Sequence, residues 1–252
     1  MSHRIAILLT NDDDSAFARA FPNDGEKVAQ LLQPLRPRWQ FSVVRVIDGE
    51  LPASVDAFDG YVITGSPASV NDNALPWLAG LLDFIRRLHA TQRPTIGLCF
   101  GHQAIARALG GQVQRNPQGW CLGLHTTRWS QSLPWMTPQQ PSMSLLAAHN
   151  EQVTQVPPGA QVLSGSAFSR VGAFALGRHI VTTQYHPEMS PRFMQALLRH
   201  LDPLAARGEV IDAATLNAAR ANLAGIDPVQ ERPLDDARVL AQWMVQFLEQ
   251  AA

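Results

Sequence analysis

The sequence contains only two cysteines, Cys99 and Cys121, among 252 residues. Two cysteines cannot form a disulfide framework, and no cluster of cysteine and histidine has the spacing of a zinc site, so we expect no bound metal. No segment approaches the roughly 20 apolar residues that a membrane-spanning helix needs. The apolar run at residues 5–9 is too short for a signal peptide, and acidic residues follow it. We therefore expect a soluble cytoplasmic protein with no membrane partner.

The chain also lacks an excess of charge of either sign. Its 20 basic and 21 acidic residues nearly cancel, and no basic run stands out. Nucleic acid is therefore a poor candidate for a partner. Hydrophobic residues make up 46% of the sequence, which is enough for a sizeable core, and the length favours one large domain over two.

Strand-like and helical patterns alternate over the first 110 residues. Such an alternation is typical of a parallel α/β sheet with right-handed crossovers. Strands are predicted at 4–9, 41–47, 61–64 and 95–98, and helical spacing occurs within 17–35, 75–89 and 102–109.

The pattern changes after Gly111. Short β-like segments, separated by turn-rich stretches, indicate added or mixed strands on the same sheet. They lie near 122–129, 144–148, 162–164 and 180–185. From Pro191 onward the sequence is rich in Ala and Leu and mostly helical in pattern, which predicts a helical C-terminal tail.

Cys99 lies where a predicted strand passes into a predicted helix. In open α/β sheets, sites form at the carboxyl ends of strands. The spacing Gly97-x-Cys99-x-Gly101 has the form of the G-x-S-x-G nucleophile elbow, with sulfur in place of oxygen. The positive end of the following helix favours a thiolate and a developing oxyanion. On this pentapeptide alone, a catalytic and a merely buried cysteine remain equally open.

A candidate base follows a second predicted strand end. Pro187 disfavours the α conformation for His186, and in an extended chain His186 and Glu188 face the same side. A carboxylate near an imidazole fixes its tautomer and supports its charged form. A His-Pro-Glu segment alone is more often a solvated turn. Together with the cysteine elbow it indicates a nucleophile, a base and an orienting acid.

The segments GLCFGHQ (97–103) and QYHPE (184–188) together resemble the class I glutamine amidotransferase domain of the Cys-His-Glu type. The similarity covers roughly Ile5–Leu201 and is greatest to stand-alone members similar to the glutaminase part of GMP synthase, a group that includes gamma-glutamyl peptidases. It implies a flavodoxin-like, three-layer, open and mostly parallel sheet with helices on both faces. We expect a catalytic domain at 1–201 and a helical extension at 202–252 packed on it.

The resemblance implies roles for four side chains. Cys99 would attack the side-chain amide of glutamine to give a gamma-glutamyl thioester. His186 would take the thiol proton and return it to the leaving ammonia, and Glu188 would orient His186. Gln103, one helical turn after the cysteine, would face the same pocket and contact the bound substrate.

The resemblance also implies backbone and substrate contacts. The N–H groups of Phe100 and Ser66 would form the oxyanion hole, with Gly65 in the same loop. Many family members have glycine where this chain has Ser66, so a Cβ is added beside the oxyanion. Asn150 and Glu151 would contact the amino-acid end of the substrate.

Three functions remain open from the sequence. The preferred one is a stand-alone hydrolase of glutamine or gamma-glutamyl peptides, without a cofactor. The second is a glutaminase subunit that supplies ammonia to a separate synthetase, because the roughly 50 residues after the last motif contain no nucleotide-binding signature. The third is a catalytically silent binding protein on the same fold. The oligomeric state is left open.

Overall fold

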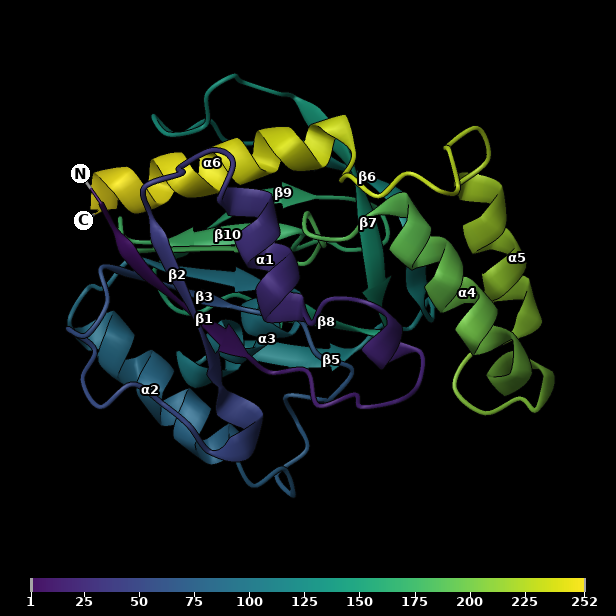
Figure 1. The fold of residues 1–252 in the computed structure, drawn as a ribbon, viewed down its shortest axis with the longest axis horizontal. Helices are drawn as coiled ribbons and strands as arrows, with labels where there is room; N and C mark the ends of the chain where they lie inside the picture. Colours follow the sequence, from purple (N-terminus) through teal and green to yellow (C-terminus); the bar gives the residue numbers. More distant parts are fainter. Residues whose placement is uncertain (1, 252) are drawn as a thin grey trace.

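A mixed sheet of nine strands, in the order β2-β1-β3-β4-β11-β10-β9-β6-β7, forms the centre of the structure (Figure 1). The computed structural model describes residues 2–251. The strands are β1 (Arg4–Leu9), β2 (Gln40–Arg45), β3 (Gly60–Ile63), β4 (Thr95–Leu98), β5 (Gln112–Arg115), β6 (Cys121–Trp129), β7 (Ser142–His149), β8 (Glu151–Gln155), β9 (Ala160–Gly165), β10 (Ala173–Leu176) and β11 (Ile180–Thr183). The helices are α1 (Asp24–Leu32), α2 (Leu78–Ala90), α3 (Phe100–Ala108), α4 (Pro191–Ala206), α5 (Ala213–Asn222) and α6 (Asp235–Ala251), with short 3₁₀ turns at Ala18–Ala20 and Val46–Asp48.

The sheet has a parallel and an antiparallel half. Strands β2, β1, β3, β4 and β11 pair in parallel. Strands β10, β9, β6 and β7 continue the sheet with antiparallel pairings. Strands β5 and β8 form a separate two-stranded sheet. The predicted open sheet is confirmed, and the strands after Gly111 extend it as mixed strands.

Helices cover both faces of the parallel half. Along β1, Ile5 and Ile7 pack on the side of α1 and α6, whereas Ala6 and Leu8 pack on the side of α2 and α3. All four side chains have no exposed surface. A strand buried on both faces has no polar face, which is why the segment is an uninterrupted apolar run. Figure 1 shows α6 and α1 together on one side of the sheet.

The C-terminal helices pack on two different parts of the sheet. Helices α4 and α5 form an apolar cluster with β6 and β7 that includes Leu146, Met194 and Leu216. Helix α6 packs on the central core, where Trp243 and Phe247 are each 1% exposed. The predicted domain boundary at residue 201 lies within α4. Within residues 2–251, no helix is long and apolar enough to cross a membrane.

The start of α1 differs from the sequence pattern, which extends back to residue 17. The helix begins at Asp24 because Asn23 caps it. The Asn23 side chain accepts a hydrogen bond from the Glu26 backbone N–H at 3.0 Å, and the Glu26 carboxylate accepts one from the Asn23 N–H at 2.9 Å. This reciprocal capping box satisfies two backbone donors and ends the preceding irregular segment.

The β4–α3 turn packs directly on the end of β3, which gives a stability prediction. A Cβ at Gly101 would lie 2.4 Å from the Ile63 carbonyl oxygen, so we expect Gly101→Ala to lower the free energy of unfolding by about 1–3 kcal/mol. Gly80, exposed on α2, is the control, because its Cβ would meet only Leu51, at 3.6 Å. Gly80→Ala should raise the free energy of unfolding by about 0.5–1 kcal/mol. Urea denaturation measures both, and equal effects would contradict the packing argument.

Candidate active site

Cys99 has a strained backbone between β4 and α3. Its φ is 47° and its ψ is −99°, and a positive φ is rare for residues other than glycine. The turn is held by two backbone hydrogen bonds, from Cys99 N–H to the Thr183 carbonyl at 2.8 Å and from Gly101 N–H to the Thr64 carbonyl at 3.1 Å. A strained residue fixed between a strand end and a helix start is consistent with the elbow that the glycine spacing predicts.

Two glycines leave room for the site. A Cβ at Gly97 would lie 2.6 Å from the Gly101 carbonyl oxygen, so glycine is needed for the tight turn. A Cβ at Gly65 would lie 2.7 Å from His186 Cε1 and 3.7 Å from Cys99 Cβ. Gly65, in the predicted oxyanion loop, therefore lies against both the His186 imidazole and Cys99.

His186 and Glu188 form a buried pair. The Nδ1 atom of His186 donates to Glu188 Oε1 at 2.7 Å, with 4% and 1% of the two side chains exposed. The His186 backbone N–H donates to the Leu146 carbonyl at 2.9 Å and holds the residue against β7. Burial opposes the charged imidazole, but the charges of Cys99 and Glu188 outweigh it and raise the pKa of His186 well above its usual value.

The second cysteine lies in a different environment. Cys121 begins β6 and is 1% exposed. Burial, together with the charge of Cys99, raises the pKa of the Cys121 thiol to about 12. Its thiol therefore stays protonated at neutral pH and is a poor nucleophile.

A cavity of about 240 Å³ opens beside Cys99. It is lined by Cys99 and by four of the other predicted site residues, Ser66, Gln103, Asn150 and Glu151. These residues come from the β3–α2 loop, the elbow, α3 and the β7–β8 turn. The fold thus brings together residues that lie far apart in the sequence.

Glu151 is the most constrained polar group of this cavity. Its carboxylate accepts from the Ser69 hydroxyl, with distances of 2.9 and 2.8 Å to its two oxygens. Its backbone carbonyl accepts from Gln103 Nε2 at 2.8 Å and from His149 Nδ1 at 2.9 Å. The predicted substrate contact Gln103 therefore borders the cavity while its amide group supports Glu151.

Several residues of the site were not predicted from the sequence. Ser69 contacts Glu151 across 82 residues of chain, and Arg115 also borders the cavity. Gln184, which is fully buried, donates from Nε2 to Cys99 Sγ at 3.5 Å. The only sequence signal for Gln184 was its place in QYHPE, two residues before His186.

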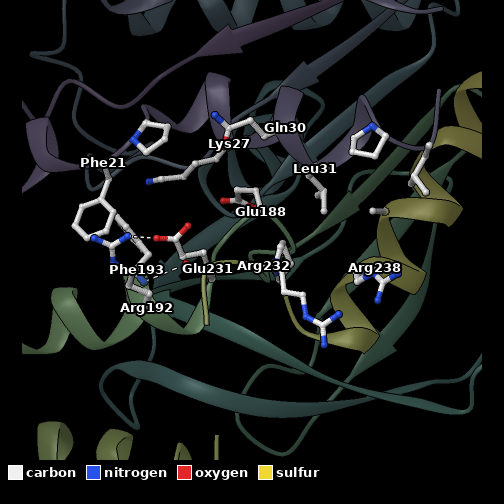
Figure 2. A pocket seen from close by; sticks show the side chains of 16 residues that line it. Phe21, Lys27, Gln30, Leu31, Glu188, Arg192, Phe193, Glu231, Arg232 and Arg238 are labelled. Atoms are coloured by element: carbon white, nitrogen blue, oxygen red, sulfur yellow. Dashed lines mark hydrogen bonds and ion pairs between the residues drawn. The ribbon is translucent and has the colours of Figure 1, made fainter. Parts of the chain in front are cut away.

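A larger cavity, of about 490 Å³, lies on another side of Glu188, among α1, α4 and α6 (Figure 2). Lys27, Arg192 and Phe193 are among its lining residues. Within the described part of the chain, Glu188 Oε2 has no hydrogen-bond partner. Cys99 lines the smaller cavity and not this one.

Two further histidines, His102 and His149, are buried. His102 has no exposed surface, and its Nδ1 lies 2.7 Å from Thr182 Oγ1. Burial, reinforced by the charge of His149, lowers the pKa of His102 to about 3. Burial likewise lowers the pKa of His149 to about 3. Both imidazoles are therefore neutral over the physiological pH range.

Comparison with known proteins agrees with the fold and the motifs. A family model described as "Glutamine amidotransferase class-I" matches residues 30–200. The chain belongs to this family. The resemblance that the elbow and QYHPE segments indicated is thereby confirmed.

Individual relatives of the family differ in their named activities. Gamma-glutamyl peptidase 3 of Arabidopsis thaliana is 29% identical over 163 residues, which are 62% of this chain and 65% of that protein. A glutamine-hydrolysing GMP synthase subunit of Sulfolobus acidocaldarius is 32% identical over 135 residues, which are 52% of this chain and 68% of that protein. A glutamine amidotransferase structure from Thermotoga maritima has the same fold, with a TM-score of 0.72, 17% identity and 98% of both chains covered.

The low pKa of His102 predicts a pH-dependent stability. Between about pH 3 and pH 6.5 the unfolded imidazole binds a proton that the folded one does not, so the free energy of unfolding falls as the pH falls. Between pH 7 and pH 5, this single imidazole should lower the free energy of unfolding by about 2 kcal/mol. His102→Gln lacks this contribution. Urea denaturation should therefore show a smaller fall in the free energy of unfolding between pH 7 and pH 5 than in the wild type. An equal loss in both proteins would refute the assignment.

Proposed function

We propose that the protein is a thiol hydrolase that cleaves the gamma-glutamyl amide of glutamine or of gamma-glutamyl peptides. The observation that carries this proposal is the buried hydrogen bond between His186 and Glu188 next to the strained Cys99. A nucleophile, a base and an acid that orients the base are the three parts that amide hydrolysis through a covalent intermediate needs. The family supports the reaction class.

In the proposed mechanism, Cys99 Sγ attacks the side-chain carbonyl carbon of the substrate. His186 accepts the thiol proton and donates it to the leaving nitrogen, which departs as ammonia or as the amino group of a peptide. The remaining gamma-glutamyl thioester is hydrolysed by water that His186 deprotonates. Glu188 holds the imidazole with Nδ1 protonated, so that Nε2 is the atom that moves protons.

The oxyanion of each tetrahedral intermediate would be bound by the backbone N–H groups of Phe100 and Ser66. The hydrogen bond from Gly101 to Thr64 supports this, because it ties the helix start to the loop that carries Ser66. Ser66 is not among the described residues with a positive φ, so the backbone at this position does not require glycine.

The amino-acid end of the substrate would lie against Glu151 and Asn150. Glu151 is a carboxylate held in place by Ser69, and it complements the charged α-amino group that every gamma-glutamyl compound carries. Gln103 borders the same cavity and holds the Glu151 carbonyl. We therefore propose that these residues select for the free α-amino group.

A second candidate is a glutaminase subunit that passes ammonia to a separate synthetase. The Sulfolobus acidocaldarius relative, which is named as one subunit of a GMP synthase, favours it. The similarity to a gamma-glutamyl peptidase favours independent hydrolysis. A catalytically silent binding protein is the least favoured, because Cys99, His186 and Glu188 are all present.

Turnover by the isolated chain separates the first two candidates. We expect the purified protein to release glutamate from glutamine or from a gamma-glutamyl dipeptide without any added protein. Labelling of Cys99 by a chloroketone analogue of glutamine, measured in parallel, reports whether the site is assembled. Rapid labelling with negligible turnover across these substrates would reject the independent hydrolase and favour the second candidate.

The two cysteines should differ sharply in reactivity. Mass spectrometry after treatment with the same chloroketone should find the label on Cys99, because the Cys121 thiol stays protonated. Cys99→Ser should lose most activity, whereas Cys121→Ser should retain it. Labelling mainly at Cys121 would overturn the assignment of the nucleophile.

The base and the acid should differ in importance. His186→Ala should lower kcat by about 10²–10⁴-fold, because proton transfer is lost. Glu188→Gln should have a smaller effect, because an amide still contacts the imidazole. Steady-state kinetics measures both, with circular dichroism as the control for folding. Equal or larger damage from Glu188→Gln in a folded protein contradicts the roles.

A further inference from the structure

Gln184 is buried against Cys99 and Gln103, two residues that line the smaller cavity. It follows β11 directly, has no exposed surface, and donates from its backbone N–H to the Gly172 carbonyl at 2.8 Å. Its side-chain Nε2 is 3.5 Å from Cys99 Sγ. Its Oε1 accepts a hydrogen bond from Gln103 Nε2 at 3.2 Å. Both ends of the buried amide therefore have a partner.

The surrounding hydrogen bonds determine which end of this amide faces the sulfur. Gln103 Nε2 also donates to the Glu151 carbonyl at 2.8 Å, and a carbonyl oxygen can only accept, so this Gln103 atom is an amide nitrogen. The atom of Gln184 that faces it must accept and is therefore Oε1. The NH₂ group of Gln184 is left facing Cys99 Sγ.

We infer that Gln184 is a catalytic residue that donates a hydrogen bond to the Cys99 sulfur, and that Gln103 is a positioning residue for Gln184. The inference rests on the proposed function, in which Cys99 is the nucleophile. A hydrogen-bond donor favours the charged form of its acceptor, so the contact strengthens when His186 removes the thiol proton. It thereby stabilises the attacking species and, later, the thiolate that leaves when the thioester is hydrolysed.

The same contacts connect the substrate site to the nucleophile. Three hydrogen bonds in sequence run from the Glu151 carbonyl through Gln103 and Gln184 to the sulfur. The residue proposed to bind the substrate amino group is thus linked to the donor that faces Cys99. A substitution of Gln103, in the middle of this series of hydrogen bonds, should therefore change the reactivity of the Cys99 sulfur although Gln103 does not contact it.

Other charged and titratable groups surround Cys99. His186 and Glu188 lie on the segment after β11, and the Cys121 thiol on β6 lies near enough for the charge of Cys99 to help raise its pKa, after burial. His149 at the end of β7, Glu151 on β8 and Arg115 on β5 border the same cavity. Because these groups remain in a Gln184 variant, the experiment compares variants with the wild type and not with an isolated thiol.

The test is the pH dependence of alkylation of Cys99 by iodoacetamide, followed site by site with mass spectrometry. In Gln184→Met, which lacks the donor, the pH midpoint for alkylation should rise by about one unit, so that the rate below both midpoints falls about tenfold. In Gln184→Glu, which has nearly the same shape, the midpoint should rise further, because an ionised carboxylate repels the thiolate.

A third variant and a control keep the test independent of any folding defect at position 184. Gln103→Met removes the group that orients the Gln184 amide, so its midpoint should rise in the same direction by a smaller amount. Gln152→Met is the matched control. Gln152 is a half-buried glutamine on β8 that contacts Asn116, and its variant should keep the wild-type midpoint.

The possible results separate the inference from the proposed function. Raised midpoints in the Gln184 and Gln103 variants, with an unchanged Gln152 control, support the inference. Unchanged midpoints in the folded variants overturn it, while a reactive wild-type Cys99 leaves the proposed function intact. If the Gln184 variants do not fold, an unchanged midpoint in Gln103→Met overturns the inference. If iodoacetamide does not prefer Cys99 to Cys121 in the wild type, the proposed function itself fails.

Discussion

The parallel register of β3, β4 and β11 is the constraint on which the candidate site depends. Ile63 of β3 is opposite Gly97 of β4, and Gly97 is opposite Thr182 of β11. The three strands therefore end at the same edge of the sheet, and the loops that follow them meet there. The oxyanion loop, the elbow and the His-Pro-Glu segment come from separate parts of the sequence, and only this register places them within contact distance.

Burial has opposite consequences for different groups in this region. It holds His102 and His149 neutral and the Cys121 thiol protonated. His186 is equally buried, but two neighbouring acids reverse the effect. Burial thus acts on all four groups, and the local partners decide which of them can carry a charge. This difference is what distinguishes the proposed base from the histidines packed around it.

Much of the fold and part of the site could be predicted from the sequence. Short apolar runs predicted β1 and β4, and the glycine spacing around Cys99 predicted the tight turn between β4 and α3. Strands β5 and β8 were missed because they are short and partly exposed, and they pair only with each other. The contacts of Glu151 with Ser69 and of Gln184 with Cys99 depend on side chains that the fold brings together. No local sequence pattern predicts these contacts.

The packing of α6 has a consequence for the order in which the protein acquires its structure. Leu248 of α6 lies so close to β3 that a Cβ at Gly60 would be 2.8 Å from it, and Trp243 is buried in the same core. Until α6 has been synthesised, α1 is the helix that covers this face of the central sheet, and the part that α6 packs on stays open. Apolar surface of these strands is then exposed to other chains, so the core can be completed only after α6 has been synthesised.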